Sequence, residues 1–555
     1  MQTARRLYIY LMSGISLGVL VSGVSMLLTV LLDALGLAGP QLGGGDVTGQ
    51  QLTLALALTV VSLPVWLIHW FVAERSVRAG VAGEAVERNS SVRGLYFALA
   101  MGLLLLAAGA GLSSAIHTVI ARLGDAQQFG GSGIGGGLAL GAVAGVAWVY
   151  HLRLRTRDWA RGPMSDGGAW LPRTYLYVAA FLGLMLFLSG FGGLLELAGR
   201  VLLNEPLFDD PSGSWWAYPL GLGVANLTVG GAVWIGHLAY SNALLRDGGW
   251  RGASERPAKL RLAYFVAVLM ATAVGAIYLA GDSARNVLET ALGVSEADAP
   301  AQVLGVVLLP LLTAIAYGAA WLVHGRWMER EAAAAGSSER FETEHRLELY
   351  PMALVGLAIG AVAAAWLIGL LLESALGIGR AITGGDIALR ELARWVPLVL
   401  LGTVAWIWSW RRAELRRTTD PVGEASSTTR RATLLIALGG SVLAGVAAAG
   451  LILYRLFGAV VGIAQSGDPV AALSTPIGVL VVAAGVAAYH AIALRRDQAI
   501  RVEPAPAQRT SVPAALDLRL IGPAGGDALS VVASIAAHLP PGYALEVADP
   551  PAIES

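Results

Sequence analysis

Tryptophan and histidine recur as pairs, three residues apart, at regular intervals along the chain. The first pair lies in "WLIHW", just before the charged "AER". Residues i and i+3 share one face of a helix, and neutral imidazole is a common haem and metal ligand, so such pairs could do chemistry. The repeat positions are Trp66, His69, Trp148, His151, Trp234, His237, Trp321, His324, Trp406 and His490.

The bland alternative to a ligand is an anchor at the membrane surface, where the rings of tryptophan and histidine bridge acyl chains and headgroups. Ser409 takes the histidine position in the fifth copy, and no second row of histidines lies at another depth. An anchor tolerates such a break, whereas an axial ligand does not. We therefore expect structural, interfacial positions and no cofactor or metal, with haem binding as an alternative.

A carboxylate recurs near the far end of four apolar stretches, in "LLDALG", "LLELAG", "VLETALG" and "LLESALG". Each lies 19–25 residues after a tyrosine that marks the other interface. On a helix this is roughly 29–38 Å, against an apolar core of ~30 Å. We therefore expect solvated acidic positions at the outer interface, with a cation-attracting vestibule as the alternative. The residues are Asp33, Glu196, Glu289 and Glu373.

Composition places these residues in a membrane protein. The chain has 555 residues, of which 56% are hydrophobic and 14% are charged, against ~25% charged in soluble domains. Twelve stretches are apolar over the ~18 residues that a transmembrane helix requires. The lack of cysteine excludes disulfides and thiolate chemistry. Since no nucleophile–base pair, nucleotide motif or nucleic-acid motif is present, we expect neither an enzyme nor a nucleic-acid partner.

The histidine positions, with Ser409 included, are 81–87 residues apart, which predicts six tandem hairpins. A second series pairs an arginine with a tyrosine one turn later, and its sixth copy keeps only Arg431. The step between arginine and tyrosine alternates from hairpin to hairpin, so the true module has two or four helices. We predict an all-α polytopic membrane protein. With four helices per module, its segments are 1–166, 167–338 and 339–497.

Positive charge gathers on one side of the predicted helices. The N-terminus, the linkers between hairpins and the final "RR" hold 28 Lys and Arg residues, the loops within hairpins hold seven, and the tail holds three. Cytoplasmic loops carry this excess, so both termini are expected in the cytoplasm. All six hairpins then share one orientation, which counts against an inverted-repeat transporter.

The tail differs in composition from the rest of the chain. Residues 498–514 form a Pro-rich linker, and residues 515–555 read as strand, helix and strand in "LDLRLIG", "DALSVVASIAAHLP" and "YALEVA". This small cytoplasmic α/β unit, similar to a βαβ motif, is too short to bury its own core. We therefore expect it to contact a protein partner or a second copy of the chain.

Three stretches, "RLYIYLMSGISL", "LLDALG" and "PVWLIHWFVAER", resemble an uncharacterised family of bacterial polytopic membrane domains built of tandem hairpins. The resemblance covers residues 5–497, most closely the first hairpin. It implies a multi-pass protein of the bacterial inner membrane, and it implies no catalytic residues.

Three function classes follow from these observations. The first is a non-enzymatic membrane scaffold or partner-binding protein. The second is a transporter or channel for a small solute or cation, which is weakened because the predicted helix interiors hold few ionisable groups. The third is a haem-binding redox protein.

Overall fold

A computed structural model describes residues 2–36, 45–78, 83–124, 133–162, 166–204, 213–255, 259–297, 299–334, 338–377, 385–461, 471–502, 528–536 and 538. The chain divides into two compact units, Met1–Arg501 and Val502–Ser555. Each unit is described by itself.

Twelve helices in the described ranges are long and apolar enough to cross a membrane, which confirms the prediction of about twelve spans and a multi-pass membrane protein. They are α1 (Gln2–Ala34), α2 (Gly45–Arg75), α4 (Ser91–Leu123), α5 (Gly133–Ala160), α6 (Asp166–Leu203), α7 (Ala217–Arg246), α9 (Lys259–Ala291), α10 (Pro300–Ala334), α11 (Ser338–Leu376), α12 (Gly385–Thr419), α14 (Thr428–Val461) and α15 (Ala471–Val502).

Three short helices interrupt this series at equal intervals. They are α3 (Glu84–Arg88), α8 (Trp250–Glu255) and α13 (Pro421–Ser426). The chain turns into α13 because Pro421 opens the helix and the Asp420 carboxylate accepts a hydrogen bond of 2.9 Å from the backbone N–H of Gly423. Each short helix follows the second of four long helices, so α1–α5, α6–α10 and α11–α15 form a first, second and third repeat.

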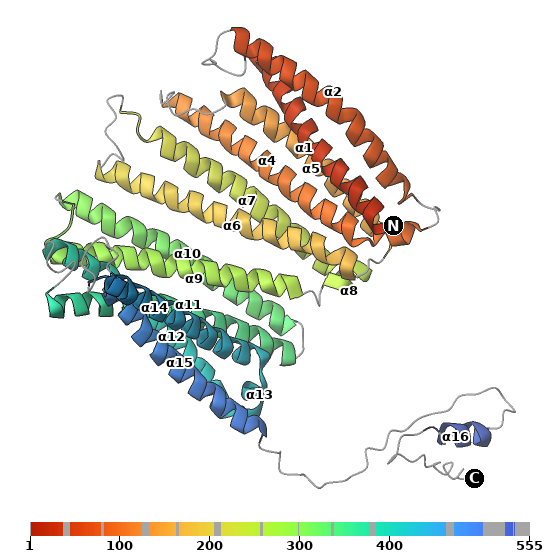
Figure 1. The fold of residues 1–555 in the computed structure, drawn as a ribbon. Helices are drawn as coiled ribbons and strands as arrows, with labels where there is room; N and C mark the ends of the chain where they lie inside the picture. The colour runs from red at the N-terminus through yellow and green to blue at the C-terminus, as the bar shows by residue number, and fades with distance from the viewer. Residues whose placement is uncertain are drawn as a thin grey trace, which may run out of the picture. The chain divides into compact units, whose positions relative to one another are not determined.

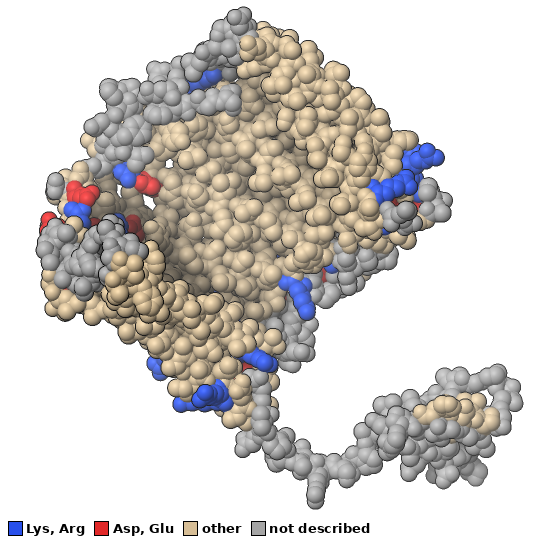
Figure 2. Space-filling model, in the orientation of Figure 1, with Lys and Arg blue, Asp and Glu red and all other residues tan. Residues whose placement is uncertain are grey.

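The long helices lie side by side in chain order, with the N-terminus, α8 and α13 at one end (Figure 1). We call this the linker end, and the opposite end, where the helices of each hairpin are joined, the loop end. The face in Figure 2 is broadly uncharged, with charged residues near its edges, as expected of a surface that contacts lipid.

Glycines allow close contact of helices within a hairpin. A Cβ on Gly190 of α6 would lie 2.3 Å from the Leu227 nitrogen of α7, and one on Gly230 of α7 would lie 2.4 Å from the Phe187 nitrogen of α6. In lipid, helix pairing depends on such packing because burial of apolar surface gains little. The hairpins are therefore the tightest units of the fold.

The described part of the tail contains one helix, α16 (Ala528–Ala536), and no strand. The helix is shorter than the stretch 527–540 predicted for it. The two predicted strands, 516–522 and 543–548, lie outside the described residues. The α/β unit expected from the sequence is therefore not supported.

Candidate functional site

A buried arginine joins four helices at the linker end of the first repeat. The side chain of Arg93, in α4, is 1% exposed. Its Nε donates to Asp158 of α5 at 3.0 Å, and its Nη1 donates to the Tyr10 hydroxyl of α1 at 3.0 Å. Its Nη2 donates to Glu74 of α2 at 2.7 Å and to Asp158 at 2.6 Å. One guanidinium thus ties α4 to the other three long helices.

The third repeat builds the same arrangement around Arg430 of α14, which is also 1% exposed. Its Nε donates to Asp497 of α15 at 2.7 Å, its Nη1 to the Tyr350 hydroxyl at 3.2 Å, and its Nη2 to Glu414 of α12 at 2.7 Å. The arginine that continues the series in the sixth hairpin is therefore Arg430. The assignment of Arg431 from the sequence was wrong by one residue.

The second repeat keeps the arginine and changes one partner. Arg261 of α9 binds Glu331 of α10 through its Nε at 2.8 Å, and it also donates to Ser241 at 2.7 Å and to Asn242 at 2.8 Å in α7. Asn242 stands five residues after His237, as Glu74 stands five after His69. The neutral amide makes this cluster poorer in acid than the other two.

A carboxylate from each short helix completes the cluster. Glu255 of α8, 1% exposed, accepts hydrogen bonds of 2.8 Å from Arg173 and 2.8 Å from the Tyr177 hydroxyl. The same arginine–glutamate–tyrosine contact recurs in the other repeats at Arg6, Glu87 and Tyr10, and at Arg346, Glu424 and Tyr350. We call these groups, with the buried arginines and their acids, the linker-end clusters.

The arrangement of the linker-end clusters is structural in character. Breaking a buried ion pair by removing one partner costs about 3–5 kcal/mol, because the remaining charge is left uncompensated. The acids Asp158, Glu255 and Asp497 are each engaged by an arginine in the described structure. Charge neutralisation at each guanidinium therefore fixes how the four helices meet.

The predicted histidines lie between helices, and the protein fills their ring nitrogens. His151 is 0% exposed; its Nδ1 lies 2.8 Å from the Ala147 carbonyl oxygen and its Nε2 lies 2.9 Å from the Tyr96 hydroxyl. His237 and Tyr175 repeat this contact at 2.9 Å, while the corresponding distance for His324 is 3.4 Å. Nitrogens engaged in this way offer no electron pair to an iron atom.

His69 and His490 bind less completely. The Nδ1 of His69 lies 2.7 Å from the Val65 oxygen, and its Nε2 lies 3.4 Å from the exposed Tyr8 hydroxyl. The Nδ1 of His490, a buried residue, lies 2.8 Å from the Val486 oxygen.

The tryptophans contact tyrosines on neighbouring helices. Trp148 of α5 donates to the Tyr175 hydroxyl of α6 at 2.7 Å and so joins the first repeat to the second. Trp234 donates to Tyr264 at 3.1 Å. The rings of Trp66, Trp321 and Trp406 pack on other aromatic rings, 6.4 Å from Trp70, 6.3 Å from Trp408 and 5.8 Å from Tyr489.

The four outer acids are dispersed over the loop end. Glu196 accepts two hydrogen bonds from Arg200, one turn later, at 2.9 and 2.8 Å. Glu289 lies 3.7 Å from Arg285. Glu373 is 3% exposed and accepts from the Ser474 hydroxyl at 2.5 Å, while Asp33 is half-buried in α1.

The register of the repeats separates Glu196 from the other acids. Asp33 and Glu373 both stand 23 residues after the tyrosine of their linker-end cluster, and Arg200 stands 23 after Tyr177. The second repeat therefore has a cation where the first and third have an anion.

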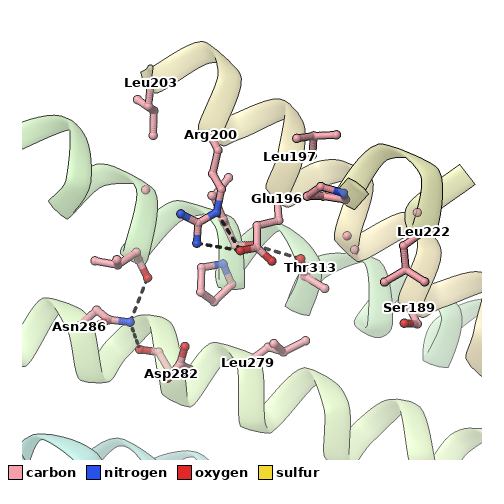
Figure 3. A pocket seen from close by; sticks show the side chains of 18 of the residues that line it. Ser189, Glu196, Leu197, Arg200, Leu203, Leu222, Leu279, Asp282, Asn286 and Thr313 are labelled. Atoms are coloured by element: carbon pink, nitrogen blue, oxygen red, sulfur yellow. Dashed lines mark hydrogen bonds and ion pairs between the residues drawn. The ribbon is translucent and has the colours of Figure 1, made fainter. Parts of the chain in front are cut away.

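A cavity of about 940 Å³ opens at the loop end of the second repeat, between α6, α7, α9 and α10. Figure 3 shows Arg200 and Glu196 from α6 on one wall, with Asp282 and Asn286 from α9 across from them. Asn286 is 8% exposed and donates to the carbonyl oxygens of Asp282 and Val306, at 2.9 and 3.0 Å. It fixes the wall where α9 meets α10.

The linker-end acids and the cavity were missed by sequence reasoning. One signal was present: acids stand seven residues after the fourth-helix histidine in every repeat, at Asp158, Glu331 and Asp497. The cavity carries no such signal, because its residues converge from four helices without a common period.

The chain matches a family model described as a domain of unknown function (DUF5671), over residues 6–146, 173–323 and 346–486. Each match begins in the first long helix of a repeat and ends in the fourth. No curated protein and no solved structure matches the chain. Since the three matches span most of its length, and since the sequence resemblance pointed to such a family, the chain belongs to the DUF5671 family of domains of unknown function.

Proposed function

We propose that this protein is a non-enzymatic scaffold of the bacterial inner membrane, with both termini in the cytoplasm. The observation that carries the proposal is the linker-end cluster, built three times around Arg93, Arg261 and Arg430. Ionisable groups used in this way hold helices together and leave no acid or base for catalysis. A rigid framework of repeats is what a protein that positions a partner requires.

The orientation rests on charge. The linker end receives the arginine-rich segments, and positive charge favours the cytoplasmic side. We take the four-helix repeat as the module, with segments 1–166, 167–338 and 339–497, because one linker-end cluster draws on all four helices. A reporter fused after Arg496 should be active in the cytoplasm, and one after Gly45 should be active outside; the reverse pattern would refute the orientation.

The tail supplies the contact with a partner in this proposal. Residues 501–555 follow α15 and include an amphipathic segment in α16, where Val531 and Ile535 are exposed. A tethered segment meets its partner at a high effective concentration. The partner is a second protein or a second copy of the chain.

Transport is the second candidate, and the cavity in the second repeat favours it. Toward the linker end, however, the space between the helices is filled by Leu184, Phe265 and Val268, each at most 2% exposed. The described conformation therefore has no passage through the second repeat. Haem binding has less support, because the protein engages the ring nitrogens of His151 and His237.

The experiment compares the full chain with a chain that ends at Ile500. Scaffolding predicts that the truncated protein inserts and folds normally but loses a co-purifying partner or a self-association, measured by pull-down and by size in mild detergent. If the two proteins behave identically, and the full chain in liposomes moves a small solute or cation, the scaffold proposal is wrong and transport replaces it.

A further inference from the structure

The cavity in the second repeat combines a charged rim with an apolar floor. Its rim includes Glu196 and Arg200 from α6 and Asp282 and Arg285 from α9, whose side chains are 29–48% exposed. Its floor reaches Leu188, Leu222 and Leu279, among other apolar residues. A ligand that suits both parts is an amphiphile.

The depth of the rim matches the level of lipid headgroups. Glu196 and Arg200 lie 19 and 23 residues after Tyr177, and Asp282 lies 18 after Tyr264. At 1.5 Å per residue these distances are roughly 27–35 Å, about the ~30 Å thickness of the apolar core. Leu188, only 11 residues after Tyr177, lies about halfway through the core. The charges therefore stand at the headgroups and the floor stands among acyl chains.

The rim carries both signs of charge with donors to spare. Arg200 uses its Nε and Nη2 to bind Glu196, and a guanidinium has further N–H groups for an anion. The Nη2 of Arg285 lies 3.1 Å from Asp282, while its buried Nε makes no hydrogen bond and lies 3.7 Å from Glu289. Two guanidiniums can bind a phosphate, and the Asp282 carboxylate can bind an ammonium.

The other repeats provide an internal comparison, since their positions correspond one to one with these. Asp282 corresponds to Ser114 and Leu451, Arg285 to His117 and Tyr454, and Glu196 to Thr29 and Gly369, counted from the arginine or tyrosine of each linker-end cluster. Tyr317 and Thr313 of the cavity correspond to Ala144 and Leu140, and to Ala483 and Val479. The paired charges are thus a property of the second repeat and are not needed to build a repeat.

We infer that this cavity binds a zwitterionic phospholipid with a primary ammonium, of the phosphatidylethanolamine type. The phosphate lies between Arg200 and Arg285, the ammonium lies at Asp282, and an acyl chain extends over the leucine floor. Its volume lies within the 300–1,000 Å³ range usual for sites of small molecules.

The test is native mass spectrometry of the full-length protein in mild detergent, with phosphatidylethanolamine, phosphatidylcholine and phosphatidylglycerol of one acyl composition at equal concentration. We expect phosphatidylethanolamine to be retained preferentially. The double variant Asp282→Asn, Arg285→Gln should lose retention by about tenfold, as removal of charge-assisted hydrogen bonds predicts. Asp33→Asn, at the position that corresponds to Arg200 in the first repeat, should retain it fully.

A second variant tests the floor without altering charge. A Cβ on Gly193 would meet no atom within 4 Å, so Gly193→Leu fills the cavity while its helix is preserved. It should also lose the lipid, with an unchanged melting temperature in lipid-free detergent. Equal retention of the three lipids, or full retention by both variants, would overturn the inference.

A soluble probe separates the lipid from its headgroup. O-Phosphoethanolamine carries the same charges without acyl chains, and we expect it to raise the melting temperature much less than the lipid does. If it stabilises the protein as strongly as phosphatidylethanolamine, and Gly193→Leu leaves that effect intact, the site takes a free zwitterion and the inferred role of the floor is wrong.

Discussion

The two ends of the helices follow different rules. At the linker end the three repeats are nearly alike: a buried arginine binds a tyrosine from the first helix and an acid from the fourth, or reaches that tyrosine through Ser241 in the second repeat. At the loop end the repeats diverge, and charges of both signs line a cavity in the second repeat. Features that every repeat keeps serve the fold they share, whereas features of one repeat serve something beyond it.

The largest expected effect is loss of a buried arginine. In Arg93→Met the carboxylates of Asp158 and Glu74 lose their common partner in a buried site, so the variant should be destabilised by about 3–5 kcal/mol. The measurement is unfolding in detergent, followed by tryptophan fluorescence. Arg153→Met, an exposed arginine in the same repeat, is the matched control and should unfold like the wild type. Equal stability of the two variants would remove the basis for a structural cluster.

An intermediate effect is expected at the short helices. Glu255→Gln replaces charge-assisted hydrogen bonds to Arg173 and Tyr177 with neutral ones and should cost about 1.5–3 kcal/mol. Glu196→Gln, at the loop end of the same repeat, should cost less than about 1 kcal/mol because its ion pair with Arg200 is partly exposed. A larger loss at Glu196 would reverse the contrast between the ends.

The histidine contacts should give a smaller effect. Tyr96→Phe removes the partner of the buried His151 Nε2 and should cost about 1–3 kcal/mol. Tyr8→Phe, at an exposed contact of 3.4 Å with His69, should be close to neutral.

A spectroscopic measurement addresses the same histidines. The purified wild-type protein should show no Soret band, and changing His69, His151, His237, His324 and His490 together to glutamine should leave its absorption spectrum unchanged. A Soret band that disappears in that variant would favour the haem alternative.

The sequence predicted what depends on local composition. Apolar length predicted the twelve spans, and the spacing of tryptophans and histidines predicted the repeats, because both are one-dimensional patterns. The resemblance to a family of uncharacterised domains was confirmed as well.

Contacts across helices were beyond such reasoning. Glu87 meets Arg6 and Tyr10 across about eighty residues, and this contact depends on where α3 lies. The apparent equivalence of Glu196 and Glu373 also failed, because the turn that carries them differs by four residues between the repeats. Register within a helix decides which side chains meet, and apolar helices of similar composition conceal it.

Arg261 and Arg285 allow the most direct test, since both lie on α9, at opposite ends of the second repeat. Each is changed separately to methionine, and the melting temperatures are compared in lipid-free detergent. The account predicts that Arg261→Met, which leaves Glu331 without its buried partner, is destabilised by about 3–5 kcal/mol, while Arg285→Met melts like the wild type. Equal melting of the two variants, or a lower melting temperature for Arg285→Met, would contradict the division between a structural linker end and a variable loop end.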